Sequence, residues 1–327
     1  MSSTNNIDIL RIYKPIKDAL LVVDQNLVNL PVNQHPILSK PLKHISNSSG
    51  KRMRAAITLL AAQINSPIND KAIAMGTAIE LFHLASLIHD DAIDKSDVRR
   101  GSETISNLYG TEMAILIGDL VFANSASTVC DTGNIHAIQR FSETTMEVST
   151  GQILETSQKF NINQTLDNYL ERIYKKTASV FEAAAETGAI ITDSTEENIS
   201  LLKSYGYNLG MAFQIIDDIL DIEGNPNEFG KPIGQDLDQG LLTLPSLIYS
   251  EKFEGKAALK SLFEGTDTEL SKPKIINEIL NSEIIDECYA QAENYCMTGR
   301  QILANLPDSE EKKSLELLLK YVIQRRK

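Results

Sequence analysis

Cysteine is scarce in this chain of 327 residues, and no Cys-x-x-Cys pair occurs. The three thiols, Cys130, Cys288 and Cys296, are too few and too oddly placed for a disulfide framework or a zinc cage. This scarcity favours a protein that works in the reducing cytoplasm.

Basic side chains are in the minority: 31 Lys and Arg stand against 44 Asp and Glu, which gives a formal net charge of −13. A chain with this charge has no general attraction to nucleic acid or to an anionic membrane surface. We therefore expect no nucleic-acid partner. Any anionic ligand must be held by a local arrangement of residues.

Long uninterrupted apolar runs are also missing. The longest apolar segment, MAILIGDLVFANSASTVC, is interrupted by Asp119 and is rich in Ser and Asn, which argues against a membrane span. The N-terminal MSSTNNIDILRIYKPI lacks the basic region, apolar run and small-residue cleavage site of a secretory signal. We expect no transmembrane segment and no secretory leader.

Helical periodicity is present almost everywhere, whereas the alternation typical of strands is hard to find. Apolar residues recur at helical spacing, as in Leu209, Phe213, Ile216 and Leu220. Stretches such as INSPIND, FNINQT and EGNPNEFGKPIGQD punctuate the chain, and no repeat, low-complexity tract or long linker occurs. The pattern predicts an all-α bundle of about ten or more helices, in one domain spanning residues 1–327.

Two nearly identical acidic strings stand inside apolar stretches: IHDDAID ends at Asp94 and IIDDILD ends at Asp221. On a helix, the first and last aspartates of each string share a face. Two such charges about 4 Å apart repel by about 4 kcal/mol at an effective dielectric near 20, and a hard cation such as Mg²⁺ relieves the repulsion. One DDxxD is as readily a charged surface, but two among large aliphatics favour a metal site. The candidate ligands are Asp90, Asp91, Asp94, Asp217, Asp218 and Asp221.

Basic residues cluster near these strings. Arg99 and Arg100 follow the first string in KSDVRRG, and Lys51 and Arg54 lie in SSGKRMR, where a loop enters a predicted helix. Arginine suits bidentate phosphate recognition, and a helix N-terminus favours anions. Basic clusters are more often solvated surface charges, but their position beside a predicted metal site favours phosphate binding.

Further residues allow two interpretations from spacing alone. Lys176 and Thr177 occur in YKKTASVFE, and Lys231 lies in the loop beyond the second string. His83, two turns before the first string, and Gln214, one turn before the second aspartate pair, are compatible with either core or ligand positions.

These residues resemble the motifs of the trans-isoprenyl diphosphate synthases, also called polyprenyl synthetases. LIHDDAIDKSDVRRG and FQIIDDILD are similar to the family's two aspartate-rich motifs, GKRMR to its GGKRLRP element, YKKTA to its KTA element, and GKPIGQDL to the loop after the second motif. The match runs in family order over about residues 45–246, and residues 247–327 fit the family's C-terminal helices. The resemblance implies the isoprenoid synthase fold, an antiparallel helical bundle with a deep central cavity, and a homodimer.

The resemblance also implies a reaction, which is the Mg²⁺-dependent head-to-tail condensation of isopentenyl diphosphate with an allylic prenyl diphosphate. The six aspartates would hold Mg²⁺ on the allylic diphosphate. The residues that would contact this diphosphate are Arg99, Lys176, Thr177, Gln214 and Lys231. The residues that would bind isopentenyl diphosphate are Lys51, Arg54, His83 and Arg100. No protein nucleophile is required, and membrane contact is expected only peripherally, at product release.

The chain departs from the family pattern at three positions. Ser49 and Ala55 replace a Gly and a Pro of the GGKRLRP element, with small expected effects on the loop. Leu241 stands where many shorter-chain members carry Lys, so one lysine contact to the diphosphate is missing.

Product length depends on the residues below the first string. Ala85 and Ser86 are small and leave the product tunnel open, as in medium- and long-chain members. Because each buried CH₂ gains about 0.8 kcal/mol, only a steric floor can stop elongation, and Phe82 and Phe141 are the candidates. We expect an all-trans product of medium to long chain, with geranylgeranyl diphosphate as the alternative.

Two other functions fit part of the pattern. A class I terpene cyclase shares aspartate-rich metal binding but normally lacks a second DDxxD and the GKRMR element. A non-catalytic subunit of a heteromeric prenyl synthase should have lost aspartates, and all six remain.

Overall fold

The helical periodicity of the sequence becomes helix along most of the computed structural model, which describes residues 8–30, 36–47, 50–224, 233–252, 255–266 and 268–325. The first elements are α1 (Ile9–Ile12), η1 (Lys14–Ile16), α2 (Lys17–Val28), α3 (Pro36–Asn47), α4 (Met53–Asn65), α5 (Asp70–Ile93), β1 (Val98–Arg99), β2 (Ser102–Glu103), α6 (Ile105–Tyr109), α7 (Thr111–Asp131) and α8 (Ile135–Gln158). The later elements are α9 (Leu166–Ile173), η3 (Tyr174–Ala178), α10 (Ser179–Ile191), α11 (Glu196–Glu223), α13 (Gln235–Asp238), α14 (Leu244–Glu251), α15 (Gly255–Phe263), α16 (Thr268–Leu280), α17 (Ile284–Leu303) and α18 (Glu310–Gln324). The predicted all-α fold class is confirmed.

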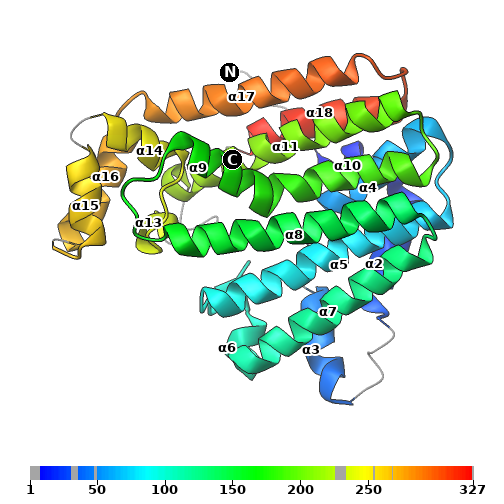
Figure 1. The fold of residues 1–327 in the computed structure, drawn as a ribbon, viewed down its shortest axis with the longest axis horizontal. Coiled ribbons are helices and arrows are strands. Elements are labelled where there is room, and N and C mark those ends of the chain that lie inside the picture. The colour runs from blue at the N-terminus through cyan, green and yellow to red at the C-terminus, as the bar shows by residue number, and fades with distance from the viewer. Residues whose placement is uncertain are drawn as a thin grey trace.

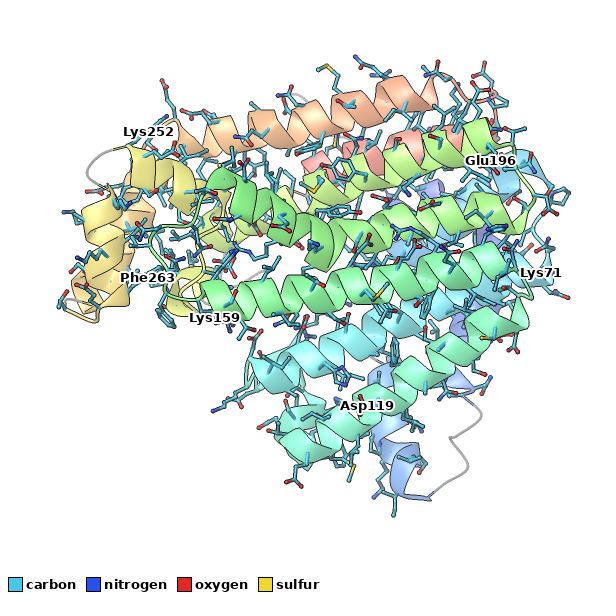
Figure 2. All side chains as sticks on the ribbon, in the orientation of Figure 1. Lys71, Asp119, Lys159, Glu196, Lys252 and Phe263 are labelled. Atoms are coloured by element: carbon cyan, nitrogen blue, oxygen red, sulfur yellow. The ribbon has the colours of Figure 1, made fainter. Side chains whose placement is uncertain are left out.

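The long helices lie side by side in a bundle (Figure 1). Helix α5 packs along α7, α10 contacts both α4 and α11, and α17 packs on α11. The short helices α13 to α16 gather at one end, on the left of the view. Helices α5 and α11 both start at the opposite end, where Lys71 and Glu196 are labelled in Figure 2, so the acidic strings near their C-termini reach the end that carries the short helices.

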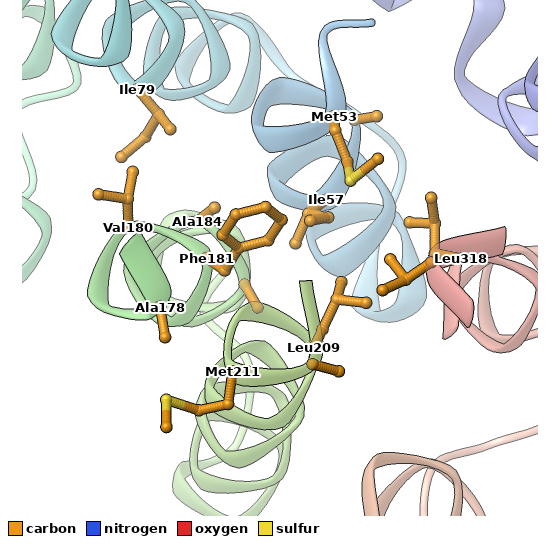
Figure 3. Close-up of a cluster of buried hydrophobic side chains, with 14 of the residues drawn as sticks. Met53, Ile57, Ile79, Ala178, Val180, Phe181, Ala184, Leu209, Met211 and Leu318 are labelled. Carbon is orange, nitrogen blue, oxygen red and sulfur yellow. The ribbon is translucent and has the colours of Figure 1, made fainter. Parts of the chain in front are cut away.

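The buried apolar side chains form a contiguous core between these helices. Figure 3 shows its centre, where Phe181 of α10 lies between Ile57 of α4 and Leu209 of α11. Removing apolar surface from water stabilises the fold by about 25 cal/mol per Å². The aspartate-bearing helices α5 and α11 both contribute to this core, which fixes the positions of their C-terminal ends.

A two-stranded hairpin follows the first acidic string, and the sequence did not predict it. In this hairpin β1 pairs with β2 antiparallel, with Arg99 opposite Ser102. Arg100 and Gly101 form the turn with φ of 52° and 77°, the left-handed conformation that two-residue hairpin turns need. The hairpin therefore gives Arg99 and Arg100 fixed backbone positions beside the end of α5.

Two helices of the described chain are long and apolar enough to cross a membrane, by length and composition alone. Helix α5 has 61% of its apolar window buried inside the bundle, as expected of a core helix. Helix α7 has only 33% of its window buried. Its exposed side includes Ile115 and Leu116, so α7 presents apolar surface that the rest of the bundle leaves uncovered.

Candidate active site

A polar pocket of about 270 Å³, here called the acidic pocket, lies where the aspartate-bearing helices end. It draws residues from α5, α8, α9, η3, α11 and α13 and from adjoining loops. Its lining residues are Asp90, Asp94, Ser96, Arg99, Glu155, Arg172, Ile173, Lys176, Thr177, Gln214, Asp218, Gln235, Asp236, Gln239, Leu241 and Thr243. The fold therefore brings both acidic strings and the YKKTA segment to one site.

The aspartates of the first string have different surroundings. Asp90 and Asp94 line the acidic pocket. Asp91 is buried, and both of its carboxylate oxygens accept from Nε of Arg99 at 2.8 Å. Asp94 has Nζ of Lys159 at 3.0 Å from its Oδ1. The hairpin and the end of α8 thus each supply a cation to this string.

Asp218 is the member of the second string that lines the acidic pocket. It is buried, and it accepts from the Tyr169 hydroxyl at 2.7 Å and from Nε2 of Gln214 at 2.7 Å. Burial raises the pKa of Asp218 to about 7, although the hydrogen bonds from Tyr169 and Gln214 act to lower it. These donors hold the carboxylate in one orientation toward the pocket.

The outer aspartates of the second string contact two other segments. Asp217 lies 2.8 Å from Nη1 of Arg325 at the end of α18. Asp221 accepts backbone N–H groups of Gln235 and Asp236 at 3.1 and 3.2 Å, which satisfies donors at the start of α13. Asp217 and Asp221, which share the predicted face of the helix, therefore bind the end of α18 and the start of α13 to the site.

The YKKTA segment forms a π-helix, η3, which the sequence did not predict. Such insertions frequently occur at functional sites. Thr177 of η3 donates to Gln214 Oε1 at 2.7 Å, which extends the hydrogen-bonded chain that reaches Asp218. The close approach of η3 to α8 depends on Gly151, because a Cβ there would lie 2.6 Å from the backbone nitrogen of Lys176.

Lys176 is the central cation of the acidic pocket. Its Nζ donates to Oε1 of Glu155 at 2.5 Å. Burial acts to lower its pKa, but Asp90 and Glu155 outweigh that effect and raise the pKa of Lys176. Burial also raises the pKa of Asp90, although Lys176 acts to lower it. The lysine is held charged by carboxylates at the place where an anionic substrate would enter.

The residues predicted to bind isopentenyl diphosphate gather beside the acidic pocket, around the start of α4. Lys51 donates to the Tyr321 hydroxyl at 2.5 Å. A Cβ on Gly50 would lie 3.1 Å from Nη1 of Arg100, which shows how close the hairpin comes to this loop. Burial, and then the nearby Arg54 and Arg100, lower the pKa of His83 well below its ordinary value. His83 is therefore a neutral ring next to cations.

The N-terminus of α4 is already occupied by a carboxylate. Oε1 of the buried Glu80 accepts the backbone N–H groups of Arg54 and Ala55, each at 3.1 Å. The sequence placed Lys51 and Arg54 at a helix start, a position that favours anions, but Glu80 satisfies these two N–H groups. What remains for a ligand is the Arg54 guanidinium, which stacks at 4.6 Å on the Phe181 ring.

The predicted chain-length residues lie on the inner side of α5 and α8. Ala85 is buried, and Ser86 donates to the carbonyl of His83. Phe82 packs edge-on against Phe141 with ring centroids 5.5 Å apart. A third ring that sequence reasoning missed, Phe122 of α7, lies 6.1 Å from Phe82 and 6.4 Å from Phe141. We call these three rings the phenylalanine cluster.

Other site residues also escaped sequence reasoning. Tyr169 and Lys159 stand alone in ordinary sequence contexts, so no spacing singled them out. Arg325 belongs to the basic RRK tail, whose role the sequence left open. Asp236 belongs to the GKPIGQDL motif, although the sequence did not identify it as a site residue. Burial, and then the nearby Asp221 and Asp218, raise the pKa of Asp236 well above its ordinary value. Lys231, which the sequence predicts as a diphosphate ligand, lies outside the described residues.

The donor set of the acidic pocket fits a hard divalent cation, since it consists of carboxylate oxygens. Within the described residues, no group of three or more His, Cys, Asp or Glu side chains stands ready to hold one ion by itself. This suits Mg²⁺, which typically takes one or two carboxylates and shares substrate phosphates. The residues therefore fit a metal that binds together with an anionic substrate.

An all-α bundle that brings two aspartate strings and several cations to one pocket defines an enzyme that handles a diphosphate with a metal ion. A family model described as "Polyprenyl synthetase" matches residues 35–281, a wider span than the motifs alone. The chain belongs to the polyprenyl synthetase family and is a trans-prenyltransferase.

Individual relatives agree with this membership. The heptaprenyl diphosphate synthase component 2 of Geobacillus stearothermophilus is 34% identical over 314 residues, covering 96% of this chain and 98% of that protein. The crystal structure of heptaprenyl diphosphate synthase from Staphylococcus aureus matches with a TM-score of 0.91 and 32% identity, over 98% of this chain and 100% of that one. Polyprenyl synthase from Caulobacter crescentus CB15, complexed with calcium and isoprenyl diphosphate, matches with a TM-score of 0.93 and 27% identity, over 99% of each chain.

Proposed function

We propose that this protein condenses isopentenyl diphosphate head-to-tail with an allylic prenyl diphosphate, with Mg²⁺ as cofactor, to make an all-trans polyprenyl diphosphate of medium to long chain. The observation that carries the proposal is the convergence of Asp90, Asp94, Asp218 and Lys176 on the acidic pocket. Carboxylates and cations from segments far apart in the chain meet there. Such a site suits a ligand that is itself a metal-bound diphosphate.

The chain's own residues would divide the work at the acidic pocket. Lys176, Thr177 and Arg99 would orient the allylic diphosphate and stabilise the negative charge that grows on it as it leaves. Bound Mg²⁺ would supply further positive charge to the leaving diphosphate. Tyr169 and Gln214 would hold Asp218 in place as a ligand.

A second group of residues would bind isopentenyl diphosphate beside that pocket. Arg54, fixed by Glu80 and Phe181, would present a guanidinium to the diphosphate, and neutral His83 would donate a hydrogen bond. Lys51 and Arg100 would complete this site from the preceding loop and the hairpin. The two substrates would thus enter through separate sets of cations.

The proposed chain length is supported by the small residues Ala85 and Ser86 below Asp90. It is also supported by the Staphylococcus aureus protein, whose name specifies a heptaprenyl product. The phenylalanine cluster lies about two helical turns below Asp90 and would act as the floor of the tunnel. Geranylgeranyl diphosphate is the product expected if the phenylalanine cluster stops elongation already at 20 carbons.

We also propose a cytoplasmic homodimer. The three cysteines are free, as expected in a reducing compartment. Exposed apolar side chains on α7 and neighbouring α8, namely Ile115, Leu116, Met146 and Ile153, offer a surface for a second copy. In light scattering, Leu116→Glu with Ile153→Glu should give a monomer. Leu10→Glu on α1, where Leu10 is also exposed, is the control and should leave the dimer intact.

The deciding experiment is incubation with farnesyl diphosphate, isopentenyl diphosphate and Mg²⁺, followed by chromatography of the dephosphorylated products. We expect a ladder of linear prenyl alcohols that depends on both substrates. Asp90→Asn should reduce kcat by about 10²- to 10³-fold while the melting temperature stays close to that of the wild type.

Other results of the same experiment would support other functions. Cyclic hydrocarbon formed without isopentenyl diphosphate would indicate a class I terpene cyclase. No turnover by well-folded protein would indicate a non-catalytic subunit that needs a partner chain. A single C20 product would indicate geranylgeranyl diphosphate synthesis.

A further inference from the structure

Lys159 forms an ion pair with a predicted metal ligand, although it belongs to no motif. Its Nζ lies 3.0 Å from Oδ1 of Asp94, the last aspartate of the first string. Both side chains are largely shielded, with 23% of Lys159 and 14% of Asp94 exposed. Because Asp94 lines the acidic pocket, the ammonium stands at the edge of the place where an anionic substrate would bind.

The backbone next to Lys159 is hydrogen-bonded to the loop between α13 and α14, where Gln239 and Leu241 line the acidic pocket. Lys159 is the C-cap residue of α8. The next residue, Phe160, has a φ of +60°, and its N–H donates to the carbonyl of Gly240 at 2.7 Å. The Phe160 ring packs edge-on against Phe263, with centroids 5.6 Å apart. Figure 2 shows Lys159 and Phe263 at the same end of the molecule.

The junction between Phe160 and Gly240 is closely packed. A Cβ on Gly240 would lie 2.6 Å from the Phe160 ring, and a non-glycine residue at positive φ is a conformation that persists only where the surroundings enforce it. The α-carbon of Lys159 is therefore fixed, and the flexible four-carbon side chain alone can move.

The cations that line the acidic pocket are hydrogen-bonded to residues other than Asp94. Arg99 is bonded to Asp91, and Lys176 to Glu155. Arg172 donates to Gln158, Gln164 and the carbonyl of Leu242. Lys159 is hydrogen-bonded to Asp94, an aspartate that lines the acidic pocket and that a metal ion would bind there. Asp91, the partner of Arg99, is not among the lining residues. A metal ion bound by Asp94 would compete with the ammonium for this carboxylate.

We propose that Lys159 is a diphosphate-binding residue of the allylic site that exchanges partners: the metal ion takes Asp94, and the released ammonium binds the substrate's diphosphate. This inference rests on the proposed function. The fixed junction keeps the released ammonium at the rim, so the anion that arrives with the metal is the partner within its reach. The exchange also avoids an unpaired buried charge, which would be costly.

The test uses the full chain with Lys159→Met, which keeps the length of the side chain and removes its charge. Calorimetry would measure the binding of Mg²⁺ alone and of inorganic diphosphate at saturating Mg²⁺. Without the competing ammonium, Mg²⁺ alone should bind about two- to fivefold more tightly. Diphosphate should bind about tenfold or more weakly, because a charged hydrogen bond is lost. Opposite signs in the two titrations are the signature of the exchange.

Two further variants separate this role from a structural one. Lys159→Arg retains the charge and should restore diphosphate binding to within about threefold of the wild type. Lys260→Met is the control, because Lys260 is an exposed lysine of α15 with an i,i+4 partner, and both titrations should match the wild type. All three variants should keep the wild-type melting temperature within a few degrees.

Two results would overturn the exchange. The first is a Lys159→Met protein that binds diphosphate as the wild type does, and the second is one in which both affinities fall together, as expected of a misplaced α8 end. These results are distinct from failure of the proposed function. In that case the wild-type chain itself would bind no Mg²⁺–diphosphate and would form no prenyl product.

Discussion

The Arg325 guanidinium lies 4.4 Å from the centroid of the Phe213 ring, and its Nη1 stands 2.8 Å from Asp217. The Phe213 ring centroid lies 5.0 Å from that of Phe181, and the Arg54 guanidinium lies 4.6 Å from the Phe181 centroid. Each ring of this aromatic pair thus has a guanidinium group stacked on it. Arg325 of this stack also pairs with an aspartate of the second acidic string, so the end of α18 is coupled to that string.

We predict that Arg325→Met increases the apparent affinity for Mg²⁺, because Asp217 loses a competing cation. Since a partly exposed ion pair is worth about 0.2–1 kcal/mol, the gain should be up to about fivefold. The measurement is the Mg²⁺ concentration at half-maximal condensation rate with both substrates saturating. Arg300→Met, an exposed arginine of α17, should leave this concentration unchanged. A higher Mg²⁺ requirement in Arg325→Met would contradict the prediction.

Tyr169→Phe should lower kcat by about tenfold, because the Asp218 carboxylate loses the hydroxyl that orients it. The buried acceptor is left with fewer donors, at a cost of about 1–3 kcal/mol in the free energy of unfolding. Tyr205→Phe is a matched control: that hydroxyl is also buried, but it donates to the carbonyl of Leu315, away from the pocket. The control should lose stability and keep kcat within about twofold. Equal losses of kcat in both variants would refute a role for Tyr169 in the site.

Ala85→Phe should shorten the product, since a ring placed at this buried position blocks the predicted tunnel above the phenylalanine cluster. Phe122→Leu should lengthen the product, because it removes one ring of that cluster. A core substitution of this kind costs up to a few kcal/mol, so product analysis should be run well below the melting temperature. The readout is the chain-length distribution of dephosphorylated products. An unchanged distribution in both variants would refute the tunnel assignment.

His83 gives the free protein a pH dependence of stability. Its pKa in the folded chain lies well below the ordinary 6.5 because of burial and then the nearby Arg54 and Arg100, so below pH 6.5 the unfolded chain binds a proton that the folded chain does not. Stability is therefore full above about pH 6.5 and falls as the pH decreases. His83→Gln should lose less of its melting temperature than the wild type between pH 7.5 and 5.5. Parallel losses in the two proteins would contradict this.

The sequence predicted the residue types of the site better than their partners. The acidic strings could be read because two copies at helical spacing inside apolar runs are rare as surface patterns, and Asp90, Asp94 and Asp218 do line one pocket. Asp217 and Asp221 instead hold Arg325 and the start of α13. Those contacts join segments distant in sequence, which local spacing cannot reveal.

Backbone features of the site escaped prediction for a related reason. The π-helix at residues 174–178 and the hairpin at residues 98–103 each depend on tertiary neighbours more than on local propensity. Leu241 is a further case in which the local sequence does not reveal the tertiary neighbours. Its departure from the family pattern indicated a missing lysine contact, but only the fold brings Lys159 to the same rim.

Glu80 separates the residues that stabilise the start of α4 from the residues that would bind a substrate there. Its carboxylate accepts the N–H groups of Arg54 and Ala55 from within the core. These donors at the start of α4 are therefore satisfied before any substrate binds. Under the proposed function, affinity for isopentenyl diphosphate would then depend on replaceable side chains, such as Arg54 and Lys51, and not on the backbone of α4. Substrate preference could drift through single substitutions there while the helix, and the bundle that depends on it, stays unchanged.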